Sequence, residues 1–180
     1  QIDGGTPKVK SYNGYLTSNA RIFVGYRQDL SSQFFGGLID ELRIAAVPLA
    51  DNTNVIALWH METSIVYGGT PTRYQTVDDD STQPTRNHHL VMGTNGDLSL
   101  PQLINGGRYG NYGKALSLDG INDACSLQYW INGLTNKNIA VDVSFKATTV
   151  SVATQTLVSA AAGFDLRIEP DGKLTWYVSG

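Results

Sequence analysis

Apolar and polar residues alternate along most of this chain, and a period of two is typical of β-strands with one buried face. The alternation is clearest over residues 139–147, where Ile, Val, Val, Phe and Ala share one face and Asp, Ser and Lys lie on the other. It recurs over residues 164–168 and 174–178, which a Pro-Asp-Gly turn separates. Because proline fixes φ and glycine accepts a positive φ, this turn predicts a β-hairpin. Further strands are expected over residues 20–26, 55–61, 114–119 and 155–160.

The composition fits a protein with many short strands and tight turns. The 180 residues include 19 glycines, and only 16% of them are charged. No segment has a convincing helical period, and the short strands are joined by turns rich in Gly and Asn. We therefore predict an all-β protein, an antiparallel two-sheet β-sandwich of the jelly-roll type.

Charge, hydropathy and cysteine content exclude several classes of protein. The formal net charge is −3, so the chain lacks the basic surface by which nucleic acid is bound. No apolar run approaches the ~20 residues of a membrane-spanning helix, so no membrane span is expected. Cys125 is the only cysteine, which rules out an internal disulfide. It lies in a predicted strand, where we expect a small buried side chain rather than a reactive thiol.

The stretch 34–50, FFGGLIDELRIAAVPLA, places a carboxylate among apolar residues. Regular alternation puts five side chains on one face of this strand: Leu38, Asp40, Leu42, Ile44 and Ala46. An ionised carboxylate in an apolar layer is costly unless donors or a cation satisfy it. Asp40 therefore needs a partner, which is a set of backbone N–H groups, an arginine or a calcium ion.

Four blocks of the sequence resemble the laminin G-like (LamG-like) jelly-roll modules of the concanavalin A-like lectin/glucanase superfamily. Residues 56–62 (IALWHME) are similar to the opening strand of that family, and residues 78–90 (DDDSTQPTRNHHL) to the segment that follows it. Residues 107–127 resemble its glycine-rich approach and Asp-Gly block, and residues 37–45 (GLIDELRIA) its closing strand. The resemblance implies a jelly-roll sandwich from a bacterial extracellular protein.

The blocks stand in an unusual order, because the closing strand precedes the opening one. The resemblance makes residues 1–50 the C-terminal part of one LamG-like module and residues 51–180 the N-terminal part of the next. Either the chain is a piece of a tandem array, or the two parts fold together as one permuted sandwich. The middle strands of a module are missing in both cases, and unpaired sheet edges invite strands from other chains. We therefore expect neighbouring copies or adjacent modules as partners, through β-strand complementation.

The superfamily includes glucanases, which carry two catalytic glutamates in a Glu-x-Asp-x-x-Glu pattern on one strand. Aligning the central aspartate of that pattern with Asp40 puts Leu38 and Arg43 at the two glutamate positions. Both catalytic groups are missing. We therefore expect no catalytic residues and no enzyme activity of this type.

A structural calcium ion is the cofactor that the sequence favours. Calcium takes about six to eight oxygen ligands and often combines carboxylates with carbonyls from turns. Residues 119–123 (DGIND) supply such oxygens at the end of a predicted strand. The family resemblance implies a calcium site near this turn and the IDE strand, which carries over to Asp40, Asp119 and Asn122. The alternative is that Asp119 and Asn122 only form an Asx-turn.

A glycan site needs an exposed aromatic platform with polar neighbours, and four residues near the Asp-Gly block are the candidates: Trp130, Tyr129, Tyr109 and Tyr112. Trp59 and Trp176 alternate with apolar residues, so we expect both in the core. We predict a noncatalytic, secreted structural or adhesive module of a bacterial surface, matrix or filament protein. The alternative is a calcium-dependent carbohydrate-binding module of a larger secreted protein.

Overall fold

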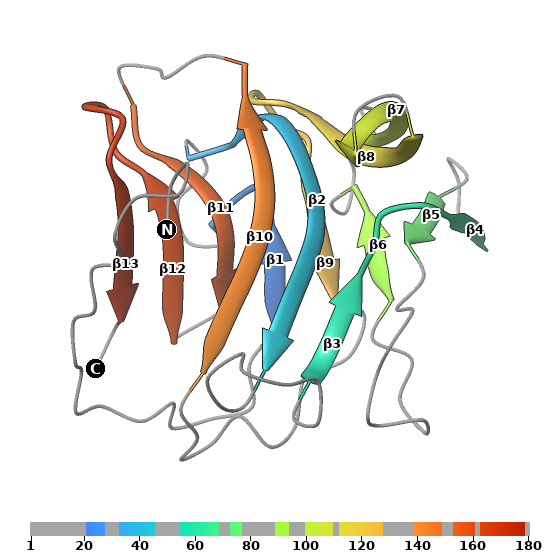
Figure 1. Cartoon of the computed structure of the whole chain (residues 1–180), viewed down its shortest axis with the longest axis horizontal. Helices are drawn as coiled ribbons and strands as arrows, with labels where there is room; N and C mark the ends of the chain where they lie inside the picture. The colour runs from blue at the N-terminus through green and yellow to red at the C-terminus, as the bar shows by residue number, and fades with distance from the viewer. Residues whose placement is uncertain are drawn as a thin grey trace.

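The structure is a computed structural model, and it describes residues 21–27, 33–45, 55–68, 73–76, 89–93, 100–109, 112–127, 139–148, 153–160 and 163–178. These residues form thirteen β-strands and no helix. The strands pair in antiparallel fashion and build two sheets that pack against each other (Figure 1). The predicted all-β, two-sheet antiparallel sandwich is therefore confirmed.

The larger sheet contains eight strands, which are β1 (Ile22–Val24), β4 (Ser64–Gly68), β5 (Arg73–Thr76), β6 (Leu90–Met92), β9 (Cys125–Leu127), β11 (Gln155–Ala160), β12 (Phe164–Ile168) and β13 (Leu174–Val178). Their order in the sheet is β13-β12-β11-β1-β9-β6-β5-β4. The predicted hairpin joins β12 to β13. Gly172 has a φ of 80° in its turn and donates its N–H to the carbonyl oxygen of Glu169 over 2.8 Å.

The smaller sheet contains five strands, which are β2 (Gly36–Ala45), β3 (Val55–Trp59), β7 (Gln102–Tyr109), β8 (Tyr112–Asp119) and β10 (Ala140–Ala147). Four of them follow the order β10-β2-β8-β7, and β3 also pairs with β2. Strands from both parts of the chain share both sheets. β1 lies between β9 and β11, and β2 lies between β10 on one side and β3 and β8 on the other.

The core lies between the sheets and draws large apolar side chains from both: Trp59, Phe23, Phe35, Phe164, Ile22, Ile39, Leu42, Ile44, Met61, Leu90, Leu116 and Leu127. The predicted burial of Trp59 is confirmed, since it is fully covered. Cys125 is also fully buried, as expected for a small apolar side chain in a strand.

One end of the larger sheet extends past the smaller sheet. In Figure 1, β12 and β13 lie beyond β10, and no described strand of the smaller sheet stands over them. Trp176 on β13 lies opposite Leu166 and stacks on the core residue Phe164, with ring centroids 4.8 Å apart. It nevertheless stays 42% exposed. The predicted core burial of Trp176 is therefore wrong, because the second sheet does not reach far enough to cover it.

The alternation predicted for β2 is broken by a β-bulge. Asp142 and Ser144 of β10, two residues apart, pair with Arg43 and Asp40, which are three residues apart. The extra residue on β2 coincides with Glu41, whose φ of 50° is left-handed.

The bulge exchanges the faces of β2. Ile39, Leu42 and Ile44 enter the core, and Leu38 is only half-buried outside it. The predicted row of Leu38, Asp40, Leu42, Ile44 and Ala46 on one face is therefore wrong. Asp40 lies on the outer face of the smaller sheet, not in the apolar core, and Ala46 is outside the described residues.

Candidate functional site

The bulge lies where β2 changes its partner on one side. Residues 36–39 pair with β8, and residues 42–45 pair with β3. β2 pairs with β10 along its other side both before and after the bulge. The two neighbours of β2 therefore separate at Asp40 and Glu41, and several polar side chains gather around this point.

Asp40 is buried although it lies outside the core, with only 4% of its surface exposed. Its Oδ1 accepts a hydrogen bond from the N–H of Glu41 over 2.8 Å, which the bulge makes available. A backbone donor is thus one partner of this carboxylate, which was the first of the three alternatives drawn from the sequence.

Gly107 of β7 allows the sheet to close over this carboxylate. A Cβ at Gly107 would lie 2.7 Å from Asp40 Oδ2 and 2.5 Å from the carbonyl oxygen of Lys114. Real Cβ contacts are essentially never this short, so any larger residue would push β7 away. A glycine here is what permits the close approach of a backbone to a buried side chain.

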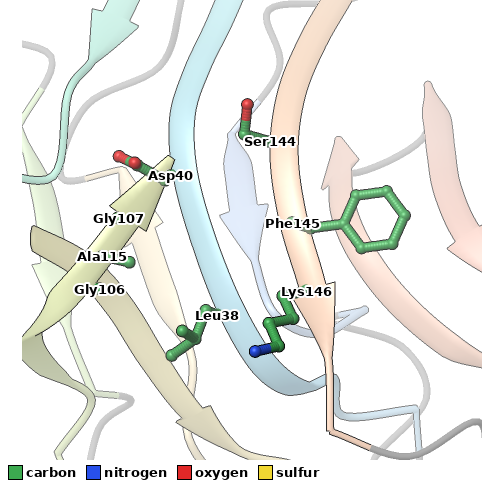
Figure 2. A pocket seen from close by; sticks show the side chains of 8 residues that line it. All are labelled: Leu38, Asp40, Gly106, Gly107, Ala115, Ser144, Phe145 and Lys146. Carbon is green, nitrogen blue, oxygen red and sulfur yellow. The ribbon is translucent and has the colours of Figure 1, made fainter. Parts of the chain in front are cut away.

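A pocket of about 210 Å³ opens beside Asp40 on the outer face (Figure 2), and eight residues line it: Leu38, Asp40, Gly106, Gly107, Ala115, Ser144, Phe145 and Lys146. Ser144 lies opposite Asp40 across the β10–β2 ladder, and Lys146 lies opposite Leu38. Side chains that are directly opposite in an antiparallel ladder share a face, so these four side chains stand on the same side of the sheet. The ring of Phe145 points away from Asp40 and packs edge-on against Phe35, at 6.2 Å between centroids.

Two further carboxylates hold the strands around the bulge. Glu41 Oε2 lies 2.7 Å from His60 Nδ1, just beyond the end of β3. Glu62 Oε2 accepts the backbone N–H of Lys114 over 3.0 Å, and its Oε1 lies 2.6 Å from where a Cβ on Gly113 would be. These contacts connect the segment after β3 to both β2 and β8.

Asp119 forms a separate polar turn at the end of β8. Its Oδ1 accepts hydrogen bonds from three successive N–H groups, over 2.8 Å from Ile121, 3.1 Å from Asn122 and 3.1 Å from Asp123. Asp123 Oδ2 in turn accepts the N–H of Asp119 over 3.0 Å. Partial burial raises the pKa of Asp119, but the backbone hydrogen bonds together outweigh it, so this pKa lies below its ordinary value. This geometry is that of the Asx-turn alternative.

The residues predicted to bind calcium do not come together in one site. Asp119 lies opposite Gly36 on the β8–β2 ladder, four positions from Asp40, which is about 13 Å along the strand. Each carboxylate accepts hydrogen bonds from N–H groups next to it in the chain. Asn122 lies in the Asp119 turn, and its Oδ1 is buried without a hydrogen bond. Among the described residues, no group of three or more His, Cys, Asp or Glu side chains is placed to hold a metal ion.

The aromatic residues predicted to bind glycans lie largely outside the described part of the chain. Trp130 and Tyr129 are outside it, and Tyr109 is described only as a backbone position at the end of β7, paired with Tyr112. The pocket residues Gly107, Ser144 and Lys146 were not identified from the sequence. No strand was predicted over residues 102–109, so the Gly106-Gly107 pair was the one available signal, because glycine in a strand often marks a close backbone approach.

The pocket combines a buried carboxylate with a hydroxyl, an ammonium group and a small apolar floor. Such a site can orient a small polar ligand through a few hydrogen bonds. None of the described residues belongs to a helix that could cross a membrane. Comparisons with protein-family models, with curated proteins and with solved structures gave no match.

Proposed function

We propose that this chain is a noncatalytic structural or adhesive module of a secreted bacterial surface, matrix or filament protein. In this proposal it assembles with neighbouring copies or adjacent modules by accepting a β-strand. Among the described residues, β10 is an edge strand of the smaller sheet with no strand on its outer side, and this observation carries the proposal.

β10 pairs with β2 along one side, and within the described residues its other side has no strand partner. Val141, Val143 and Phe145 pack against the core from this strand but are only partly buried. An edge strand with free backbone groups is a template for another strand. A strand added to β10 would both satisfy those groups and cover the apolar side chains of β10.

The larger sheet supports the same proposal. Trp176 of β13 stacks on the core residue Phe164 and is 42% exposed. Exposed large apolar side chains next to an uncovered sheet face are typical of interaction surfaces. A strand added beyond β10 would extend the smaller sheet toward β12 and β13, where Trp176 could pack beneath it.

The family resemblance and the missing catalytic pattern both support the proposal. If the sequence is interpreted as LamG-like, the chain lacks the middle strands of a module. A strand added from another chain would supply this missing part. The noncatalytic part of the proposal rests on Leu38 and Arg43, which occupy the positions of the two glutamates in the glucanase pattern.

Sedimentation velocity over a series of protein concentrations tests the assembly. We expect species larger than the monomer that grow with concentration, and Trp176→Ser should shift them toward the monomer. Tyr177→Ser is the matched control, because Tyr177 is the next residue, is similarly exposed (43%), and lies on the opposite face of β13. Monomers at every concentration, or equal effects of the two variants, would contradict strand-mediated assembly.

A further inference from the structure

The two end strands of the larger sheet carry most of the large apolar side chains that the described residues expose. These side chains are Ile65, Val66, Ile104, Ile121, Trp176 and Tyr177. Ile65 and Val66 belong to β4, and Trp176 and Tyr177 belong to β13. Neither strand contains a proline or a charged residue, which are the usual protections of an exposed sheet edge. Both ends of this sheet are therefore suited to pairing with a further strand.

β4 and β13 lie at opposite ends of the larger sheet (Figure 1) and run in opposite directions. Every neighbouring pair in this eight-stranded sheet is antiparallel, so strand direction alternates from one end to the other. Within the described part of the chain, β13 pairs only with β12 and β4 only with β5. If a second copy in the same orientation placed its β4 beside β13, the two strands would be antiparallel. The sheet could then continue from copy to copy without turning either copy over.

The side chains of the two end strands alternate in the same phase. Trp176 lies opposite the core residue Leu166, so it stands on the inner face of the sheet, and Tyr177 stands on the outer face. At the other end, position 64 lies opposite position 76, which lies opposite the core residue Leu90. Val66 is two residues further along β4, so it stands on the inner face and Ile65 on the outer face. Each end strand therefore offers one large apolar side chain to each face.

The backbone of β13 can accept a strand at Trp176. Hydrogen-bonded and non-hydrogen-bonded pairs alternate along an antiparallel ladder. The N–H of Glu169 donates to the carbonyl oxygen of Lys173 over 2.9 Å, in register with the β12–β13 ladder. By alternation, the backbone groups of Trp176 point away from β12.

The backbone of β4 can accept a strand at Val66 for the same reason. The N–H of Gly93 donates to the carbonyl oxygen of Ala124 over 2.7 Å, in register with the β6–β9 ladder. The same alternation, carried across β6 and β5, points the backbone groups of Val66 away from β5. Trp176 of one copy and Val66 of another can therefore form a hydrogen-bonded pair.

We propose that β13 of one copy pairs with β4 of the next copy, with Trp176 opposite Val66 and Tyr177 opposite Ile65. In this register the five residues of β13 overlap all five residues of β4. Aromatic residues opposite β-branched residues are favourable cross-strand pairs. The inference rests on the proposed function for a neighbouring copy as the partner, but it uses edges other than β10.

This interface joins two different surfaces, so each copy keeps one end available for a further copy. Sheets twist by roughly 20–25° per strand, which amounts to about half a turn over the eight strands of one copy. The copies also advance along the axis of this twist, because each new sheet is added at the end of the last. The product is an open helical filament and not a closed ring.

Cysteine cross-linking tests the register. Positions 65 and 177 of neighbouring copies form a non-hydrogen-bonded pair, with about 4.5 Å between Cα atoms, which a disulfide can span. Ile65→Cys/Tyr177→Cys should therefore give a ladder of dimers, trimers and longer species after mild oxidation, seen by non-reducing gel electrophoresis and lost on reduction. Val66→Cys/Tyr177→Cys is the matched control, because its two cysteines stand on opposite faces, and it should give no ladder. The substituted side chains are all exposed, and the native Cys125 is buried.

The outcomes separate this interface from an acceptor edge at β10. No ladder from either double variant, or equal ladders from both, overturns the inference. So does a disulfide-linked dimer formed by Ile65→Cys or Tyr177→Cys alone, since that requires two identical surfaces to meet. If the natural chain forms larger species in sedimentation velocity and neither double variant gives a ladder, this inference is wrong and assembly through β10 stands. Monomers at every concentration and no ladder would contradict both.

Discussion

The imidazole of His60 lies against the carboxylate of Glu41, with 2.7 Å between Nδ1 and Oε2. Glu41 is the bulge residue of β2, and His60 directly follows the last residue of β3. β3 pairs with β2 only from Leu42 onward, so this contact extends the connection between the two strands by one position. The Glu41–His60 contact therefore lies at the position where β2 stops pairing with β8 and begins to pair with β3.

The left-handed backbone of Glu41 makes a specific prediction about stability. A β-branched side chain at a φ of 50° clashes with its own backbone, whereas glutamate tolerates this conformation better. Glu41→Val should therefore lower the free energy of unfolding by about 1–2 kcal/mol, measured by urea denaturation. Arg43→Val is the control, because Arg43 lies two residues on in the same strand with extended backbone. A loss in the Arg43 variant as large as in the Glu41 variant would contradict the argument.

The close approach of β7 to the backbone of β8, and to Asp40 of β2, predicts an effect of adding one methyl group. Gly107→Ala puts a Cβ 2.5 Å from the carbonyl oxygen of Lys114, and backbone cannot move aside as a side chain can. We expect the variant to lose about 1–3 kcal/mol of stability, as overpacked positions do. Gly36→Ala is the milder comparison, since its nearest heavy atom would lie at 3.3 Å. Thermal denaturation should show a clearly lower midpoint for Gly107→Ala than for Gly36→Ala.

The strands of the sandwich were predictable where the signal is local. The alternation of residues 164–168 and 174–178 and the turn between them gave the β12–β13 hairpin directly. The bulge was not predictable, because left-handed φ is usually indicated by glycine or asparagine and here falls on a glutamate. One inserted residue then reversed the face on which Asp40 was expected.

The error at Trp176 has a different origin. Alternation correctly puts this side chain on the same face as Leu166, but it does not tell how far the opposite sheet extends. Ser144 and Lys146 are a similar case. They look like the solvent face of a strand, and only the nearby Gly106 and Gly107 of β7, which line the same pocket, make that face one side of a pocket.

The buried thiol of Cys125 should be unreactive in the folded protein. Burial raises its pKa far above the ordinary value, and the nearby charge of Asp123 raises it further. We expect no labelling by iodoacetamide in native buffer and complete labelling in denaturant, both measured by mass spectrometry. Since Cys125 is the only cysteine, the count is unambiguous. Rapid labelling of the folded chain would contradict the packing of β9.

The lowered pKa of Asp119 predicts a pH dependence of stability. The ordinary value for the unfolded chain is 3.8, and the folded pKa lies below it, so the charged form is favoured by folding. The contribution is therefore present above the unfolded pKa and is lost as the pH falls through the folded one. Asp119→Asn should be less stable than the natural chain at neutral pH, and the difference should shrink as the solution is acidified below the unfolded value. Urea denaturation across this range measures it, and a difference that is constant with pH would contradict the assignment.

The Asp119 turn is also where the calcium prediction can be tested. If a calcium ion binds at Asp119 and Asn122, adding calcium to EDTA-treated protein should raise the melting temperature, because a ligand that binds only the folded state stabilises it. Asp119→Asn should abolish the rise, whereas Asp171→Asn, in the exposed β12–β13 turn, should preserve it. Asp40→Asn should also preserve it, since the structure separates Asp40 from this turn. A melting temperature that calcium leaves unchanged would leave the Asx-turn as the whole role of these residues.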